Sequence, residues 1–136
     1  MKLVKLNYGW QYYAVFLLPL CFIFPYGKYR CTHKEFKDPL ETHLIAGFDG
    51  WSASHILFFC LMGYLFPKSF IPTMIIGICW ELFEHLYGKH RPGWLGGYGD
   101  CADLQSDQTE DGNWWYGKWT DIVCNALGFL GGAAMS

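Results

Sequence analysis

Acidic and amide side chains occur at helical spacing inside apolar parts of this sequence. Glu81 and Glu84 are three residues apart, so they share one face of a predicted helix. Asp121 and Asn125 are four apart in a later apolar segment. Carboxylates are costly in apolar surroundings unless they are paired, protonated or bound to a cation. Because these oxygens are hard ligands, they predict a site for Ca²⁺, Mg²⁺ or Mn²⁺ rather than for zinc, although a protonated glutamate bonded to a neighbouring helix would also fit.

A histidine near these acids is the candidate general base. His55 lies about one turn into another apolar segment, six residues after Asp49. An imidazole can accept a proton near neutral pH, but a histidine among apolar helices can also serve only as a hydrogen-bond partner between helices. Asp49 could orient His55, bind the ion, or merely cap the helix that follows. Asp111, or Glu110 beside it, is a further candidate ligand, because the last apolar segment begins soon after them; a solvated loop is the alternative for both.

Four helices are predicted to position these groups. Charged residues make up 16% of the chain and apolar residues 52%, whereas a usual soluble domain has roughly 25% charged residues. Apolar runs predict helices over about 8–26, 51–66, 70–87 and 117–134. Since a bilayer core takes about 20 helical residues, we expect an all-α integral membrane bundle of four transmembrane helices, forming one domain over 1–136. A soluble bundle with long apolar stripes is the alternative.

The order of the helices predicts where the polar groups lie. Four spans would place both termini and the turn at 67–69 on one side, and the loops 27–50 and 88–116 on the other. The candidate site residues would then lie at the level of these two loops. The loops carry more Lys and Arg than the other side, so the positive-inside rule predicts that they are cytosolic. We expect the endoplasmic reticulum or another internal membrane.

Composition also bears on the partners of the chain. A net charge of −2 without a basic patch argues against nucleic acid. The six cysteines include no CxxC pair, which argues against a zinc ribbon, while a Cys31–Cys101 disulfide stays open. Gly128 and Gly132 would allow close helix packing, within the bundle or in a homo-oligomer.

Four short motifs occur in order over about residues 48–132. They are Phe48-Asp49-x₅-His55, Trp80-Glu81-Leu82-Phe83-Glu84, Trp114-Trp115 and Cys124-Asn125-Ala126-Leu127-Gly128. In order and spacing they resemble the base-exchange phosphatidylserine synthases, and the chain looks like the catalytic core of that family. Parts of the pattern are also similar to small uncharacterised bacterial membrane proteins and to VanZ-like proteins.

The resemblance implies a Ca²⁺-dependent exchange of phospholipid head groups with a small amino alcohol such as serine. By that analogy, His55 would deprotonate the incoming hydroxyl, and the ion would polarise the phosphodiester. The competing hypothesis is a non-catalytic, metal-stapled membrane scaffold that binds lipid or a partner membrane protein. The predicted catalytic residues are His55, Asp49 and Asn125, and the predicted metal ligands are Glu81, Glu84, Asp111 and Asp121.

Overall fold

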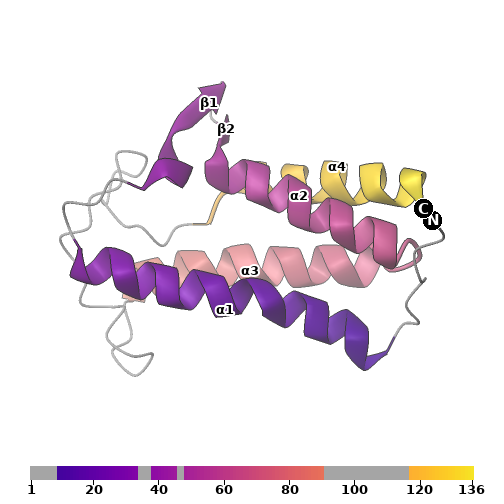
Figure 1. Ribbon diagram of the computed structural model, residues 1–136, viewed down its shortest axis with the longest axis horizontal. Helices are drawn as coiled ribbons and strands as arrows, with labels where there is room; N and C mark the ends of the chain where they lie inside the picture. Colours follow the sequence, from indigo (N-terminus) through magenta and orange to yellow (C-terminus); the bar gives the residue numbers. More distant parts are fainter. Residues whose placement is uncertain (1–8, 34–37, 46–47, 91–116) are drawn as a thin grey trace.

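The computed structural model describes residues 9–33, 38–45, 48–90 and 117–136, and its main elements are four helices. They are α1 (Trp10–Thr32), α2 (Gly50–Leu65), α3 (Phe70–His90) and α4 (Trp119–Met135). The helices run alternately up and down, and α1 begins and α4 ends at the end of the bundle that holds the α2–α3 turn (Figure 1). The prediction of an all-α architecture with four helices is confirmed.

Helix α1 extends further than its apolar residues predict. The predicted helix stops near residue 26, whereas α1 continues through Pro25 to Thr32. Tyr26 lies in the last turns of α1, and its hydroxyl donates a hydrogen bond of 2.6 Å to the buried side chain of Asp38. The indole of Trp51 donates to the other oxygen of Asp38 at 3.1 Å. These contacts tie the last turns of α1 to the start of α2.

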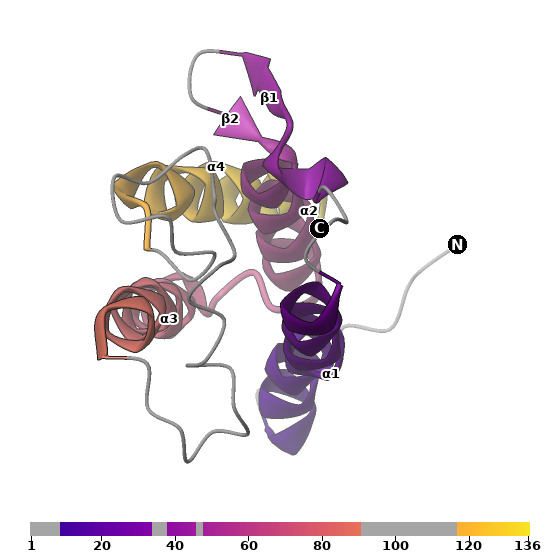
Figure 2. The ribbon, with the colours of Figure 1, turned by 90° about the vertical axis from the view of Figure 1, so that its left-hand side faces the viewer.

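A small hairpin between α1 and α2 was not predicted. A short 3₁₀ helix, η1 (Pro39–Glu41), is followed by the antiparallel strands β1 (His43–Ile45) and β2 (Phe48–Asp49), which lie at the start of α2 (Figure 2). Such short strands leave no periodic signal in the sequence. The hairpin matters because it positions Asp49: β2 leads directly into α2, and Asp49 is the N-cap residue of that helix.

Helices α2 and α4 make the closest contact in the bundle. Seen end on, α2 and α4 form one layer and α1 and α3 the other (Figure 2). A Cβ atom at Gly128 would collide with the backbone carbonyl of Ile56, and one at Gly132 with that of Cys60. The two glycines therefore act in packing between these helices, one of the two roles that their spacing predicts.

The buried apolar core lies toward the end of the bundle that holds the α2–α3 turn. Its members are Tyr12, Phe59, Met62, Phe66 and Phe129. Large apolar side chains also cover the outer surfaces of the helices, including Leu18, Phe22, Leu57, Leu61, Ile71, Ile75, Leu127 and Leu130. Among the described residues, no helix combines the length and the hydropathy needed to cross a membrane.

Candidate metal centre

Three helices each contribute one potential metal ligand to a single point. His55 comes from α2, Glu81 from α3 and Asp121 from α4, and one ligand atom from each lies within 4.8 Å of the other two. The Nε2 atom of His55 is 3.7 Å from Oε1 of Glu81 and 4.0 Å from Oδ2 of Asp121. Both acids are buried. Two carboxylates held this close in a buried position favour a bound cation or a shared proton between them.

One oxygen of Glu81 has no hydrogen-bond partner among the described residues. Glu81 is only 5% exposed, and its Oε2 accepts a hydrogen bond of 2.9 Å from the backbone N–H of Lys118. Its Oε1, the atom that faces His55, is buried and receives no hydrogen bond. A buried acceptor without a donor is costly, so this atom marks where a cation would bind.

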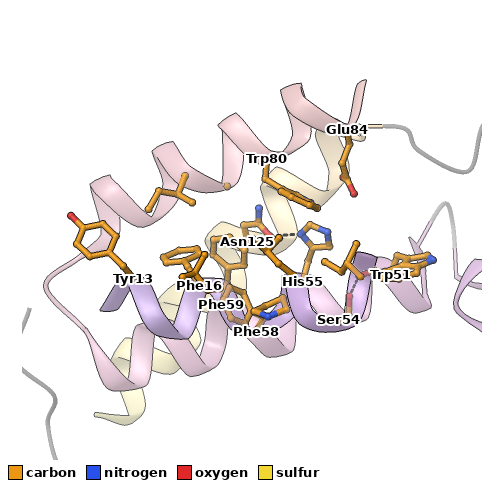
Figure 3. Close-up of a pocket in the computed structure, with 16 residues that line it drawn as sticks. Tyr13, Phe16, Trp51, Ser54, His55, Phe58, Phe59, Trp80, Glu84 and Asn125 are labelled. Carbon is orange, nitrogen blue, oxygen red and sulfur yellow. Dashed lines mark hydrogen bonds between the residues drawn. The ribbon is translucent and has the colours of Figure 1, made fainter. Parts of the chain in front are cut away.

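The imidazole of His55 is oriented by a side chain of α4. Its Nδ1 lies 2.8 Å from Oδ1 of the fully buried Asn125 (Figure 3). An amide oxygen can only accept, so this contact places the proton on Nδ1 and leaves the lone pair of Nε2 pointing at the two carboxylates. The ring also stacks on Phe59, with an interplanar angle of 7°.

Asp121 is held in place by a second contact between α2 and α4. The hydroxyl of Ser52, near the start of α2, donates a hydrogen bond of 2.6 Å to Oδ1 of Asp121. That bond leaves Oδ2 to face His55. Ser52 was not predicted as a site residue, because a lone serine near a helix start carries no specific signal.

Asp49 caps α2, and within the described part of the chain no hydrogen bond or ion pair joins it to His55. Its Oδ1 accepts from the backbone N–H of Ser52 at 2.8 Å, and its Oδ2 forms an ion pair with Nζ of Lys118. Burial alone would raise the pKa of Asp49, but the hydrogen bonds from Lys118 and Ser52 and the charge of Lys118 together lower it. Asp49 is therefore a buried anion that links the start of α2 to the start of α4, in agreement with the capping alternative.

An apolar pocket of about 350 Å³ adjoins the metal centre. Glu84 and Trp51 lie toward one end of the pocket and Tyr13 at the other, with His55 and Asn125 between them (Figure 3). Its other walls are mostly aromatic and aliphatic side chains of α1, α2 and α3, including Phe16, Leu20, Phe58, Ile76 and Trp80. Glu84 thus lines the pocket, whereas Glu81 joins His55 and Asp121.

Two predictions fall on residues outside the described ranges. Asp111, a predicted ligand, is one of them, and Cys101 of the predicted Cys31–Cys101 disulfide is the other; the side chain of Cys31, within α1, is not described either. The cysteines Cys21, Cys60, Cys79 and Cys124 are free. Lys118, like Ser52, was not predicted as a site residue, although it holds Glu81 through its backbone N–H and Asp49 through its side chain. The only signal in the sequence was its position next to the last apolar run.

Comparisons of the chain with family models, with curated proteins and with solved structures found no match. The resemblance to phosphatidylserine synthases therefore stays a prediction that rests on the motifs. The geometry is independent of that resemblance: three potential ligands converge beside an apolar pocket.

Proposed function

We propose that the chain is a membrane enzyme that exchanges phospholipid head groups with the help of a divalent cation. The observation that carries this proposal is the meeting of His55, Glu81 and Asp121 beside an apolar pocket. A phospholipid carries an anionic phosphodiester next to long hydrocarbon chains, so it needs a cationic site and an apolar surface side by side. The pocket volume falls in the range of about 300–1,000 Å³ that is typical of ligand sites.

In the proposed reaction, the hydroxyl oxygen of an incoming amino alcohol such as serine forms a bond to phosphorus. The bond from phosphorus to the old head-group oxygen breaks, and the proton lost by the incoming hydroxyl ends on the leaving alcohol, so no net proton is released. Glu81 and Asp121 would hold the ion, which supplies positive charge beside the phosphate oxygens. Two side chains at the pocket could carry the proton: His55, as the sequence predicts, and Glu84.

The outer surface of the bundle supports a membrane location for this reaction. Leu17 and Leu18 of α1, Leu57 of α2, Ile71 of α3 and Leu127 of α4 are all exposed. A monomeric soluble protein rarely exposes apolar surface on every side, whereas a bundle among lipid tails does so without cost. The pocket between α1, α2 and α3 would then receive a lipid from the bilayer while its phosphate reaches the metal centre. The cytosolic orientation of the loops stays a prediction.

The proposal is tested by reconstituting the purified chain in phospholipid vesicles with labelled serine. We expect label to enter lipid in the presence of a divalent cation, to stop when a chelator is added, and to resume when the ion is restored. Asp121→Asn keeps the shape of the side chain but removes its charge, and we expect it to abolish the exchange. No incorporation by the wild-type chain with any of Ca²⁺, Mg²⁺, Mn²⁺ or Zn²⁺ would overturn the proposal.

A second candidate function is the metal-stapled scaffold. It is favoured by one observation: Asp121 and Asn125 each bond to α2, through Ser52 and His55, so they also join the two helices. A scaffold would gain thermal stability from the ion and incorporate no label. An enzyme would incorporate labelled serine into lipid. Measuring both thermal stability and label incorporation on the same reconstituted protein therefore distinguishes the two functions.

A further inference from the structure

We propose that His55 is a ligand of the ion through Nε2, and that the site therefore prefers a transition-metal ion that binds imidazole well, such as Zn²⁺ or Fe²⁺, over Ca²⁺. This identity of the ion makes the proposed function more specific. It rests on the proposed function only for the task of the bound ion, which is to assist lipid exchange. It also changes the role that the sequence predicts for His55, from a proton acceptor to a third ligand beside Glu81 and Asp121.

The distances favour a metal ion over a proton at the centre of this group. Nε2 lies 3.7 and 4.0 Å from the nearest oxygens of Glu81 and Asp121, beyond the hydrogen-bond range of about 2.7–3.2 Å. A proton on Nε2 would therefore not be well bonded to either carboxylate. Bonds of about 2.0–2.2 Å hold two ligands of one tetrahedral ion about 3.3–3.6 Å apart. The observed separations of 3.7 and 4.0 Å are only slightly longer, so a small inward shift of the side chains would place a cation between them.

The surroundings of the three groups also match those of metal ligands. A metal-bound histidine usually donates its other ring N–H to an oxygen, which fixes the tautomer. Here Asn125 offers that oxygen to Nδ1 at 2.8 Å. The carboxylates are oriented in the same way, Glu81 by the backbone N–H of Lys118 and Asp121 by the hydroxyl of Ser52. In each carboxylate, the oxygen that accepts this bond is not the one that faces His55.

The ligand types decide which ion is preferred. Ca²⁺ is usually held by six to eight oxygens in proteins, whereas imidazole nitrogen favours ions such as Zn²⁺ and Fe²⁺. One nitrogen and two carboxylates, on three different helices, form a compact set with room for water or a substrate oxygen as a further ligand. An oxygen-only calcium site would not need Asn125 to fix the tautomer of His55.

The test is equilibrium dialysis of the purified full chain against Zn²⁺, with and without excess Ca²⁺, with bound metal measured by mass spectrometry. We expect one Zn²⁺ per chain, retained in Ca²⁺, lost in His55→Ala and weakened about 10–100-fold in Asn125→Ala. His85→Ala is the matched control, because His85 is an exposed histidine of α3 outside the group, and it should bind as the wild type does.

A spectroscopic measurement on the wild-type chain keeps the inference testable if the His55 variant does not fold. With Mn²⁺ bound, pulsed electron paramagnetic resonance should detect coupling to one imidazole nitrogen. Binding of Ca²⁺ as tight as that of Zn²⁺, with no nitrogen coupling, would overturn the inference and leave a calcium-dependent exchange intact. Zn²⁺ binding that depends on His55, without lipid exchange under any condition, would instead uphold the inference and remove the proposed function.

Discussion

Replacing Lys118 with methionine tests whether the buried ion pair holds the start of α4 against α2. Asp49 is 0% exposed, and the side chain of Lys118 is 18% exposed. Lys118→Met retains the length and the apolar part of the side chain but removes the charge that pairs with the Asp49 carboxylate. The backbone N–H of Lys118 still donates to Glu81, so the candidate metal centre is not directly altered.

The expected loss of stability follows from the burial of the pair. Removing one partner of a buried ion pair costs about 3–5 kcal/mol, because the other charge stays desolvated. Lys118 keeps some exposure, so we expect the lower end, about 3 kcal/mol at neutral pH. The hydrogen bond from the backbone N–H of Ser52 to Asp49 remains and limits the damage.

The effect should also depend on pH in a defined direction. The pKa of Asp49 is lowered in the folded protein, so the stabilisation is present above the unfolded pKa, about 3.9, and is lost as pH falls through the folded value. The free-energy difference between the wild type and Lys118→Met should therefore be largest near pH 7 and shrink below about pH 4. Chemical unfolding of the purified chains across this pH range measures that difference.

Two variants control this experiment. Lys68→Met removes an exposed lysine in the α2–α3 turn and should change the free energy of unfolding by less than about 0.5 kcal/mol. The double variant Asp49→Asn with Lys118→Met should recover part of the lost stability, because it removes the desolvated charge. If Lys118→Met costs no more than Lys68→Met, or if the double variant is the less stable one, the reasoning is refuted.

Two further predictions concern packing and a buried hydrogen bond. Gly132→Ala should destabilise the bundle by about 1–3 kcal/mol, because the new Cβ meets the backbone of α2. Gly131→Ala is the control: its Cβ enters open space, so it should be neutral or stabilising by up to about 1 kcal/mol. Thermal unfolding compares the two variants, and equal effects would contradict the packing. Tyr12→Phe removes the buried hydroxyl that bonds to Thr73 at 2.9 Å and should cost about 0.5–1.5 kcal/mol, because Thr73 keeps its bond to Ser69. Tyr13→Phe alters an exposed residue and should cost almost nothing in the same melt, so a similar loss in both would argue against the bond.

Hydropathy predicted the number and order of the helices because each apolar run is long and bounded by charged or turn residues. It did not predict that α1 would continue to Thr32, because Lys28 and Arg30 end the apolar run while the backbone stays helical. The hairpin before α2 was missed for a different reason, since strands of two or three residues are formed by pairing and leave no periodic pattern.

The site residues were predicted in part. Alternating helix direction places His55, Glu81 and Asp121 at one end of the bundle, and the structure brings them together. Periodicity could not decide between Glu81 and Glu84, because residues three apart point only about 60° from each other and the packing of α3 decides which one faces inward. Nor could it pair Asp49 with Lys118, which are separated by 69 positions and meet only because α2 and α4 begin at the same end.

The central claim is that a cation binds where α2, α3 and α4 meet, and the metal content of a matched pair of variants tests it most directly. Glu81→Gln and Glu84→Gln remove the same charge from the same helix, but only Glu81 joins His55 and Asp121. After dialysis against a transition-metal ion, the wild type and Glu84→Gln should each retain one ion per chain, and Glu81→Gln should retain none. Loss of the ion in Glu84→Gln alone, or no bound ion in the wild type, would contradict the account.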